Sequence, residues 1–410
     1  MQSQACLSSA ERAGLRTKGN VPTLRFPEFS GEWHRTTIGE CCSPLEYGMN
    51  APAKEYDGKN KYIRITDIDE ETCTYKYDDV VSPNALLEEK YKVLDNDILF
   101  ARTGASTGKA YLYDKKDGLM YYAGFLIRGN VKPDFNSKFV FLQTQTQKYK
   151  KWVDIMSIRS GQPGINSQEY SSFKFHLPPS KVEQDKISTL FTLLDVRITT
   201  QIRIINEMQS LISGITQRIS KHSSVRMVLL SELLVERNEK NTELFPVHSV
   251  SVSEGVINQI DYLGRSFSAA DTSHYNVAHR GDIIYTKSPT GEFPFGIVKR
   301  NAIESNVAVS PLYGVYKPIS DDVAIYLHYY FCSPLNAQNY LHKLIQKGAK
   351  NTINITNQRF VQNCIPLPDK KTLTGFVKLI SAVSAKLELE KSLLETLQTQ
   401  KRYLLTQMFV

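Results

Sequence analysis

Residues 165–178 read INSQEYSSFKFHLP, and residues 353–366 read INITNQRFVQNCIP. Ile165, Asn166 and Pro178 of the first stretch recur at one constant offset as Ile353, Asn354 and Pro366 of the second. Upstream, DNDILFARTGASTG (95–108) resembles RGDIIYTKSPTGEF (280–293) at nearly the same offset. Landmarks that recur in one order at one spacing indicate an internal duplication. Each copy approaches half the length of the chain.

A long apolar seam follows each copy. Residues 181–220 and 371–408 contain no proline and one glycine each, and their apolar residues recur at steps of three or four, which predicts helices with a coiled-coil seam. A helix of about 40 residues is about 60 Å long and needs a partner for its apolar stripe. Because the first helix leads into the second copy and the second helix follows it, we expect an antiparallel coiled coil. The alternative places each helix in a separate globular core. The predicted seam residues are Ile187, Phe191, Leu194, Ile198, Ile205, Met208, Ile215, Phe376, Ile380, Val383, Leu387, Leu394, Leu397 and Leu404.

The segments between the helices mix strand and helix signals. Stretches such as KYIRITDI (61–68) and YYAGFLIRG (121–129) are rich in β-branched and aromatic residues, which favours strands. Segments near 137–157 and 322–346 look helical. The predicted fold class is α+β, with two duplicated mixed α/β domains separated by two long helices. The expected boundaries are a flexible leader (1–20), a first domain (21–179), a first long helix (180–222), a second domain (223–367) and a second long helix (368–410).

Composition narrows the class of protein. The 410 residues include 41% hydrophobic residues and carry a formal net charge of +8, as in a folded chain for which a polyanionic partner is permitted but not required. The six cysteines form no CxxC pair, and no Cys/His spacing suits zinc, so we expect neither disulfides nor a metal. No apolar run spans a membrane, and the N-terminus lacks the apolar region of a signal peptide. We therefore expect a soluble, cytoplasmic protein.

The sequence contains segments that look like catalytic or nucleotide-binding motifs, but none of them matches such a motif fully. GASTGK (104–109) has one residue too few between its glycines for a P-loop and lacks the following Ser or Thr, which argues against nucleotide binding. Acidic pairs such as Asp95 and Asp97 could suggest a metal nuclease, but we expect Asp97 and Asp282 to cap the turn entering a strand. No adenine-methyltransferase tetrapeptide and no nucleophile elbow is present. The sequence predicts no enzyme.

Basic and polar residues at matching places in the two copies suggest contact with DNA. Long cations hold phosphates, while Arg, Asn and Gln pair with base edges. For one copy alone we would favour solvated helix ends with capping amides, but the recurrence favours DNA. The candidate DNA-binding residues of the first copy are Arg64, Arg102, Thr103, Ser106, Thr107, Lys109, Lys150, Lys151, Arg159, Ser160, Gln162 and Asn166. Those of the second copy are Lys287, Ser288, Thr290, Lys343, Lys347, Lys350, Asn351 and Asn354.

The chain resembles the specificity subunit of type I restriction-modification systems. The resemblance rests on VPTLRFPEFSGEW (21–33), DILFARTG (97–104), GQPGINSQEYSSFKFHLPP (161–179) and above all KVEQDKISTLFTLLD (181–195). It implies a phage-defence protein with two target-recognition domains, each reading one half of a split double-stranded DNA site. It also implies assembly with two methyltransferase subunits and, for cleavage, two translocase-nuclease subunits. S-adenosylmethionine, ATP and Mg²⁺ would reside on those partners, with no cofactor on this chain.

Two departures limit the resemblance. The second helix leader, PDKKTLTGFVKLISA (368–382), lacks the Glu-Gln-x-Lys-Ile pattern of the first, and residues 1–20 have no place in the pattern. The alternative function is a coiled-coil adaptor that displays two protein- or peptide-binding domains without DNA specificity. A nuclease or methyltransferase ranks third, because its motifs are missing.

Overall fold

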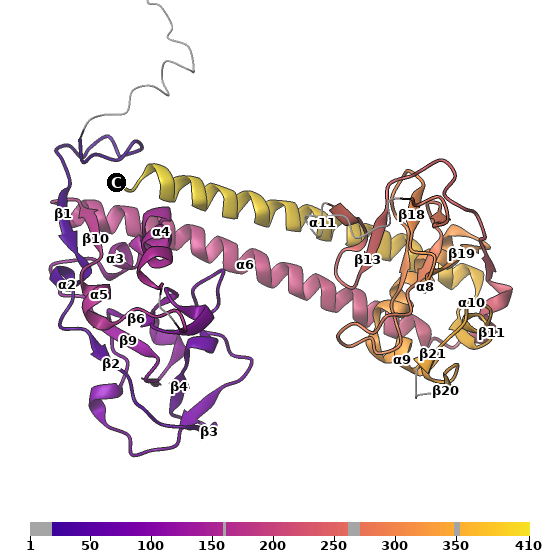
Figure 1. The fold of residues 1–410 in the computed structure, drawn as a ribbon, viewed down its shortest axis with the longest axis horizontal. Coiled ribbons are helices and arrows are strands. Elements are labelled where there is room, and N and C mark those ends of the chain that lie inside the picture. The colour runs from indigo at the N-terminus through magenta and orange to yellow at the C-terminus, as the bar shows by residue number, and fades with distance from the viewer. Residues whose placement is uncertain (1–18, 159–160, 261–270, 348–352) are drawn as a thin grey trace, which may run out of the picture. The chain divides into compact units, whose positions relative to one another are not determined.

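A computed structural model describes residues 19–158, 161–260, 271–347 and 353–410. Contacts divide the chain into two compact units. Unit 1 comprises Met1–Ile202 together with Ser392–Val410, and unit 2 comprises Arg203–Lys391. Each unit is mixed α/β (Figure 1).

Unit 1 is built around a four-stranded antiparallel sheet of order β2-β9-β6-β7. A separate antiparallel pair, β1 with β10, joins the first strand of the unit to the strand that leads into the long helix α6. The strands are β1 (His34–Thr37), β2 (Glu46–Tyr47), β3 (Ala53–Glu55), β4 (Lys61–Ile63), β5 (Val81–Pro83), β6 (Asp97–Ala101), β7 (Ala110–Leu112), β8 (Met120–Tyr122), β9 (Leu126–Asn130) and β10 (Lys174–Leu177). The helices are α2 (Ile38–Cys41), α3 (Ser137–Gln143), α4 (Gln147–Met156), α5 (Ser167–Ser171) and the first part of α6 (Lys181–Ser220).

Strand β6 is buried along its whole length because it has a core on each face. Ile98 and Phe100 belong to one apolar cluster, while Leu99 and Ala101 belong to another. Successive side chains of a strand point to opposite faces, so a central strand with two covered faces reads as a continuous apolar run. This anchoring fixes the point at which the following loop, beginning at Arg102, leaves the sheet.

The core of unit 1 includes the C-terminal end of the chain. Leu405 and Met408, from α11 (Lys370–Gln407) and the residue after it, are buried in the same cluster as Trp33, Phe139 and Phe191. The N-terminal segment also reaches this end, since the backbone N–H of Leu24 donates to the carbonyl of Gln407 at 2.9 Å. Unit 1 is thus assembled from both ends of the chain.

Unit 2 repeats the plan with a four-stranded antiparallel sheet of order β12-β19-β16-β17 and a β11-β22 pair. Its strands are β11 (Arg226–Leu229), β12 (Leu234–Glu236), β13 (His248–Ser251), β14 (Gly255–Asn258), β15 (Asn276–Ala278), β16 (Ile283–Tyr285), β17 (Val298–Arg300), β18 (Val307–Val309), β19 (Gly314–Pro318), β20 (Gln346–Lys347), β21 (Ile353–Asn354) and β22 (Cys364–Leu367). Its helices are α8 (Asp321–Cys332), α9 (Pro334–His342), α10 (Asn357–Phe360) and the parts of α6 and α11 that fall within the unit.

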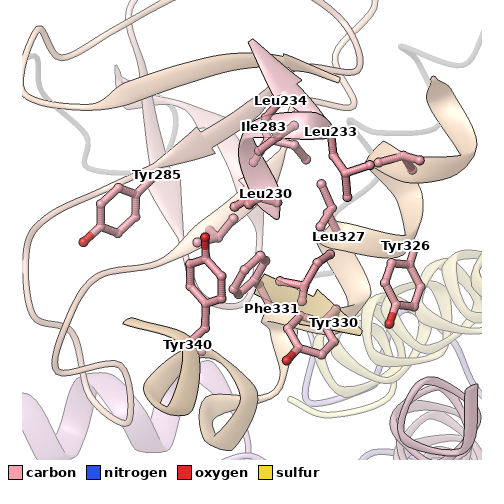
Figure 2. Packing of buried hydrophobic residues seen from close by; sticks show 14 of the residues in the cluster. Leu230, Leu233, Leu234, Ile283, Tyr285, Tyr326, Leu327, Tyr330, Phe331 and Tyr340 are labelled. Carbon is pink, nitrogen blue, oxygen red and sulfur yellow. The ribbon is translucent and has the colours of Figure 1, made fainter. Parts of the chain in front are cut away.

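The core of unit 2 is rich in tyrosine. Figure 2 shows Phe331 of α8 beside Tyr340 of α9, and Leu230 and Ile283 belong to the same cluster. Buried tyrosines need a partner for each hydroxyl. The hydroxyl of Tyr340 donates to the carbonyl of Phe360 at 2.5 Å, which ties α9 to α10.

The predicted duplication is confirmed by the order of the main elements. In each unit a paired first strand and a four-stranded sheet precede two helices, a short helix, a last strand and a long helix, in the same order along the chain. The expected helices near 137–157 and 322–346 are each two helices, α3 with α4 and α8 with α9. The expected turn caps are also confirmed. Asp97 accepts the N–H of Leu94 at 2.7 Å, and Asp282 accepts that of His279 at 2.8 Å.

The predicted register of the repeat is wrong by two positions near its end. His34 pairs with Leu177, and the corresponding first residue of β11, Arg226, pairs with Leu367. Leu367 is therefore the equivalent of Leu177. The offset inferred from the sequence is two residues too small, so it aligns β10 two positions too early on β22, Cys364–Leu367.

The reason for the slip is the repeated pattern in INIT (353–356). Ile355, rather than Ile353, is the equivalent of Ile165, and both are 2% exposed. Thr356 caps α10 as Asn166 caps α5, since either side chain can accept a backbone N–H. Asn354 lies instead in β21.

The two long helices pack together within each unit. In unit 1, Leu194 and Ile198 of α6 form a buried cluster with Leu397 of α11. In unit 2, Ile215 in the later part of α6 packs on an apolar cluster that contains Phe376 from the early part of α11. The early part of one helix therefore meets the late part of the other, and the expected antiparallel arrangement is confirmed. Every predicted seam residue is buried or half-buried.

Candidate nucleic-acid interface

In unit 1, the loop that follows β6 is folded against a second loop that precedes α5. The first loop contains a short 3₁₀ helix, Gly104–Ser106. The N–H of Gly104 donates to the carbonyl of Pro163 at 3.0 Å, and the N–H of Ile165 donates to that of Arg102 at 2.9 Å. The structure thus brings together two segments, 102–109 and 161–166, that lie far apart in the sequence.

Glycine is required at one point of the first loop. Gly108 has a φ of +91°, a region that side-chain-bearing residues rarely adopt. A Cβ there would also lie 2.5 Å from a methyl group of Val153 on α4. The hydroxyl of Tyr170 accepts the Gly108 N–H at 3.1 Å and donates to the carbonyl of Ala101 at 2.6 Å. The loop leads into strand β7 rather than a helix, which is not the geometry of a P-loop.

Three elements meet where Arg102 leaves the sheet. The Arg102 guanidinium lies 4.8 Å from the ring centroid of Tyr47, the last residue of β2. The Tyr47 hydroxyl accepts the N–H of Ser167, the first residue of α5, at 3.2 Å. This hydrogen bond lowers the pKa of Tyr47. We call Tyr47, Arg102 and Ser167 junction 1. Tyr47 is 42% exposed, so the stacked pair faces solvent.

Unit 2 builds a junction from the same elements with different side chains. Lys287 stands five positions after Asp282, as Arg102 stands five positions after Asp97. Burial lowers the pKa of Lys287, while the nearby Glu236 carboxylate, on β12, opposes this shift. Glu236 accepts the side-chain amide of Asn357, the first residue of α10, at 2.8 Å. We call Glu236, Lys287 and Asn357 junction 2.

Two other predicted DNA-binding cations are paired with carboxylates of the protein. The guanidinium of Arg64 binds both oxygens of Asp67, at 2.8 and 2.9 Å, and also Asp79. The Asp67 hydrogen bond raises the pKa of Arg64. Lys109 pairs with Glu70 at 3.2 Å. These two cations are partly neutralised within the protein.

Helix α4 displays two exposed lysines, Lys150 and Lys151. Thr146 caps the helix by accepting the N–H of Tyr149 at 3.2 Å, and Tyr149 is buried beneath it. In unit 2, Lys343 is exposed and directly follows α9. Cations at these positions have room to reach phosphates.

The polar candidates occupy exposed or half-exposed loop positions. The backbone N–H of Asn166 donates to the Glu169 carboxylate at 2.8 Å, and the backbone N–H of Glu169 donates to the side-chain oxygen of Asn166 at 2.9 Å. The side-chain oxygen of Asn166 therefore caps the helix, as the alternative interpretation expects. Those with some exposure are Thr103, Ser106, Thr107, Gln162, Ser288 and Thr290. Arg159, Ser160, Lys350 and Asn351 lie outside the described residues, as does most of the 1–20 leader, and Lys347 and Asn354 are described only as strand backbone in β20 and β21.

Sequence reasoning missed four of the six junction residues, which are Tyr47, Ser167, Glu236 and Asn357. Tyr47 and Glu236 stand on short edge strands, and only the pairing of β2 with β9 and of β12 with β19 places them beside the cations. Asn357 could have been found from the correct offset, because it follows Ser167 at the same spacing at which Leu367 follows Leu177.

Residues 32–209 match the protein family described as "Type I restriction modification DNA specificity domain". The fold agrees over nearly the whole length. A type I restriction-modification system S subunit from M. genitalium superposes with a TM-score of 0.62 at 14% identity, covering 95% of this chain and 99% of that one.

A second solved chain, from a study of complex assembly and conformational transition of the type I R-M system, has a TM-score of 0.50 at 14% identity. It covers 92% of this chain and 97% of its own. The resemblance to a type I specificity subunit is confirmed, and the match supports recognition of a DNA target.

The described part of the chain contains neither a candidate membrane span nor a candidate metal site. No helix there has the length and apolar character of a membrane span. No group of three His, Cys, Asp or Glu side chains within the same ranges is placed to hold a metal ion.

Proposed function

We propose that this chain directs a type I restriction-modification complex to a split DNA target, with unit 1 reading one half-site and unit 2 the other. The observation that carries this proposal is the pair of junctions. Each unit presents a cation just after its central strand, Arg102 after β6 and Lys287 two residues after β16, near a side chain that is hydrogen-bonded to the first residue of a short helix. A duplicated protein that meets DNA with equivalent surfaces suits two half-sites about one helical turn apart, ~34 Å.

The chemistry of the junctions differs, so the half-sites should differ. Arg102 stacks on an aromatic ring and offers a planar fork of donors, which suits the two acceptors of guanine in the major groove. Lys287 lies near a carboxylate and an amide, groups that can accept from cytosine or pair with adenine. Lys150, Lys151 and Lys343 would hold phosphates and set the register. The remaining predicted DNA-binding residues stay candidates of the same kind.

The partners belong to the same proposal. We propose two methyltransferase subunits and, for cleavage, two translocase-nuclease subunits, which would carry S-adenosylmethionine, ATP and Mg²⁺. This chain would itself be non-catalytic and cytoplasmic. The domain boundaries 21–179, 180–222, 223–367 and 368–410 are proposed as units of exchange, since target-reading cores joined by helices should be separable.

Methylation mapping of DNA exposed to the chain with its methyltransferase partner tests the function. The expected result is a split adenine-containing motif. Replacing residues 223–367 with the matching segment of a related chain should alter one half-site and leave the other intact. An absence of any motif, with DNA affinity independent of sequence, would favour the adaptor function. A change in both half-sites after the exchange would contradict the assignment of one half-site to each unit.

A further inference from the structure

A buried ammonium group in unit 2 has no carboxylate partner among the residues that the structure describes. Lys299 lies in β17 and is 5% exposed. Its Nζ donates to the carbonyl of Val252 at 2.7 Å and to the sulfur of Cys332 at 3.4 Å. Within the described residues, no acidic side chain forms an ion pair with it. A buried charge is costly unless it is paired. The two hydrogen-bond acceptors of Lys299 are therefore the Val252 carbonyl and the Cys332 sulfur, and of these the sulfur is the only one on a side chain.

A second N–H group points at the same sulfur. His328 lies one turn before Cys332 on α8, and its Nδ1 accepts the backbone N–H of Arg300 at 3.3 Å. Burial, reinforced by the charges of Lys299 and Arg300, lowers the pKa of His328 to about 3. The ring is then neutral, and a neutral imidazole whose Nδ1 is an acceptor carries its proton on Nε2. That nitrogen lies 3.8 Å from the Cys332 sulfur.

We propose that Cys332, Lys299 and His328 form a thiol site that reacts with hydroperoxides. The sulfur would attack one oxygen of hydrogen peroxide, so that an S–O bond forms as the O–O bond breaks. The departing oxygen takes the thiol proton and leaves as water, so sulfur loses two electrons and peroxide gains them. The product is a sulfenic acid. Lys299 and His328 donate hydrogen bonds first to the departing oxygen and then to the new sulfenic oxygen.

The other described cysteines lack this environment. Cys41 and Cys42 are buried, and burial raises their pKa values to about 11 and about 12. Burial also raises the pKa of Cys73. Cys364 is half-buried like Cys332, but no hydrogen bond to its sulfur is found among the described residues. Cys364 is therefore the matched control, because it has similar exposure without the two N–H donors.

Mass spectrometry of the full-length chain tests the site. A Cys6→Ser background removes the cysteine that lies outside the described residues. Dilute hydrogen peroxide is added with dimedone, which traps sulfenic acids, and labelling is followed at each cysteine. We expect Cys332 to be labelled roughly tenfold faster than Cys364. The Lys299→Met variant should slow Cys332 by roughly tenfold and leave Cys364 unchanged, because methionine fills the same space without the donor.

Thermal unfolding checks that each variant is folded. If Lys299→Met does not fold, His328→Gln provides the second test, since it keeps the buried lysine and should also slow labelling of Cys332. Equal labelling of Cys332 and Cys364 would overturn the proposal. So would wild-type labelling of Cys332 in a folded variant of either donor. The readout does not involve DNA, so the result is independent of the proposed function.

Discussion

At the scale of single residues, Glu183 shows how the N-terminal segment is attached. Its side chain, in the first turn of α6, is 1% exposed. Arg25 donates to both of its oxygens, at 2.7 and 2.8 Å, and the indole N–H of Trp33 donates to one of them at 3.3 Å. The hydrogen bond to Glu183 raises the pKa of Arg25. This buried ion pair is therefore one of the contacts that attach the segment to α6.

Removing the charge of Glu183 should destabilise unit 1. Glu183→Gln leaves Arg25 partly buried without its counter-ion, a change that typically costs about 3–5 kcal/mol, so we expect a loss of roughly 3 kcal/mol in the free energy of unfolding. Denaturant unfolding measures it. Glu28→Gln is the control, because the Glu28–Lys186 pair is close to half exposed and should contribute less than about 1 kcal/mol. Equal effects of the two substitutions would show that burial of the first pair does not matter.

Arg102→Lys should change one base preference and little else. Lysine keeps the charge but loses the planar fork that pairs with two acceptors and stacks on Tyr47. A bidentate base contact is worth about 1–3 kcal/mol, so methylation of the original motif should fall roughly 5- to 150-fold while one position of one half-site relaxes. Motif sequencing checks this. The matched substitution Lys287→Arg should affect only the other half-site. An unchanged motif in both variants would remove the two junctions from base reading.

The double substitution Lys150→Ala with Lys151→Ala should weaken DNA binding on all sequences alike. Both side chains are exposed on α4. Each lost phosphate contact makes the negative slope of log affinity against log salt less steep by about 0.9. A salt titration on specific and unrelated DNA measures the slope. Lys90→Ala with Lys92→Ala, in a segment without predicted DNA contacts, should leave it unchanged. An unaltered slope in the α4 variant would exclude these lysines from the interface.

At the scale of elements, the two long helices were easier to predict from their apolar repeat than the short segments were. The seams of α6 and α11 repeat over many turns, so apolar positions alone located both helices to within a few residues. The short segment at 353–356 contains two candidate apolar-polar pairs, and the sequence could not choose between them. The junctions could be predicted only in part, because β2 is very short and its partner strand β9 comes much later in the chain.

Helix α6 also has an apolar stripe that its partner helix does not cover. Val182, Leu193 and Val196 are each more than half exposed, and at about 100° per residue they fall within an arc of about 60°. Exposed apolar patches of this kind mark protein interfaces. In the proposed complex, the methyltransferase subunit would contact this stripe.

Charging the stripe should weaken assembly without unfolding the chain. Leu193→Glu with Val196→Glu should reduce co-purification of the methyltransferase subunit at least roughly tenfold, since two apolar contacts contribute on the order of 1.5–3 kcal/mol each when fully buried. Thermal unfolding should stay close to wild type because the side chains are already exposed. Leu86→Glu, at a loop position that is 86% exposed, is the control. Unchanged co-purification would assign the partner to another surface.

At the scale of the whole molecule, the lengths of the two helices should set the spacing of the half-sites. Gly214 on α6 is exposed, and apart from the backbone of its own helix no described atom lies within 4 Å of the place a Cβ would occupy, so we choose this position for an insertion. Four inserted residues add about 6 Å and slightly more than one turn, which nearly preserves the seam. That length corresponds to about two base pairs.

The four-residue insertion should therefore widen the unread spacer of the motif by one or two base pairs and keep both half-sites. A two-residue insertion should rotate the seam by about 200° and prevent assembly. Methylation-motif sequencing of both variants, with the partner present, measures the outcome. An active four-residue variant with an unchanged spacer would show that the helices do not set the spacing.

The shared core at the C-terminus also governs the order in which the chain can fold during its synthesis. Unit 2 is one continuous stretch, whereas unit 1 needs Leu405 and Met408 to cover Trp33, Phe139 and Phe191. A ribosome that has finished Ile202 must still make about half of the chain, which takes on the order of 10–40 s at roughly 5–20 residues per second. For that time the first unit to emerge keeps an open apolar surface, while the second can already close. The unit made first is completed last, so nascent chains, and chains truncated before α11, are the forms most exposed to aggregation and to chaperones.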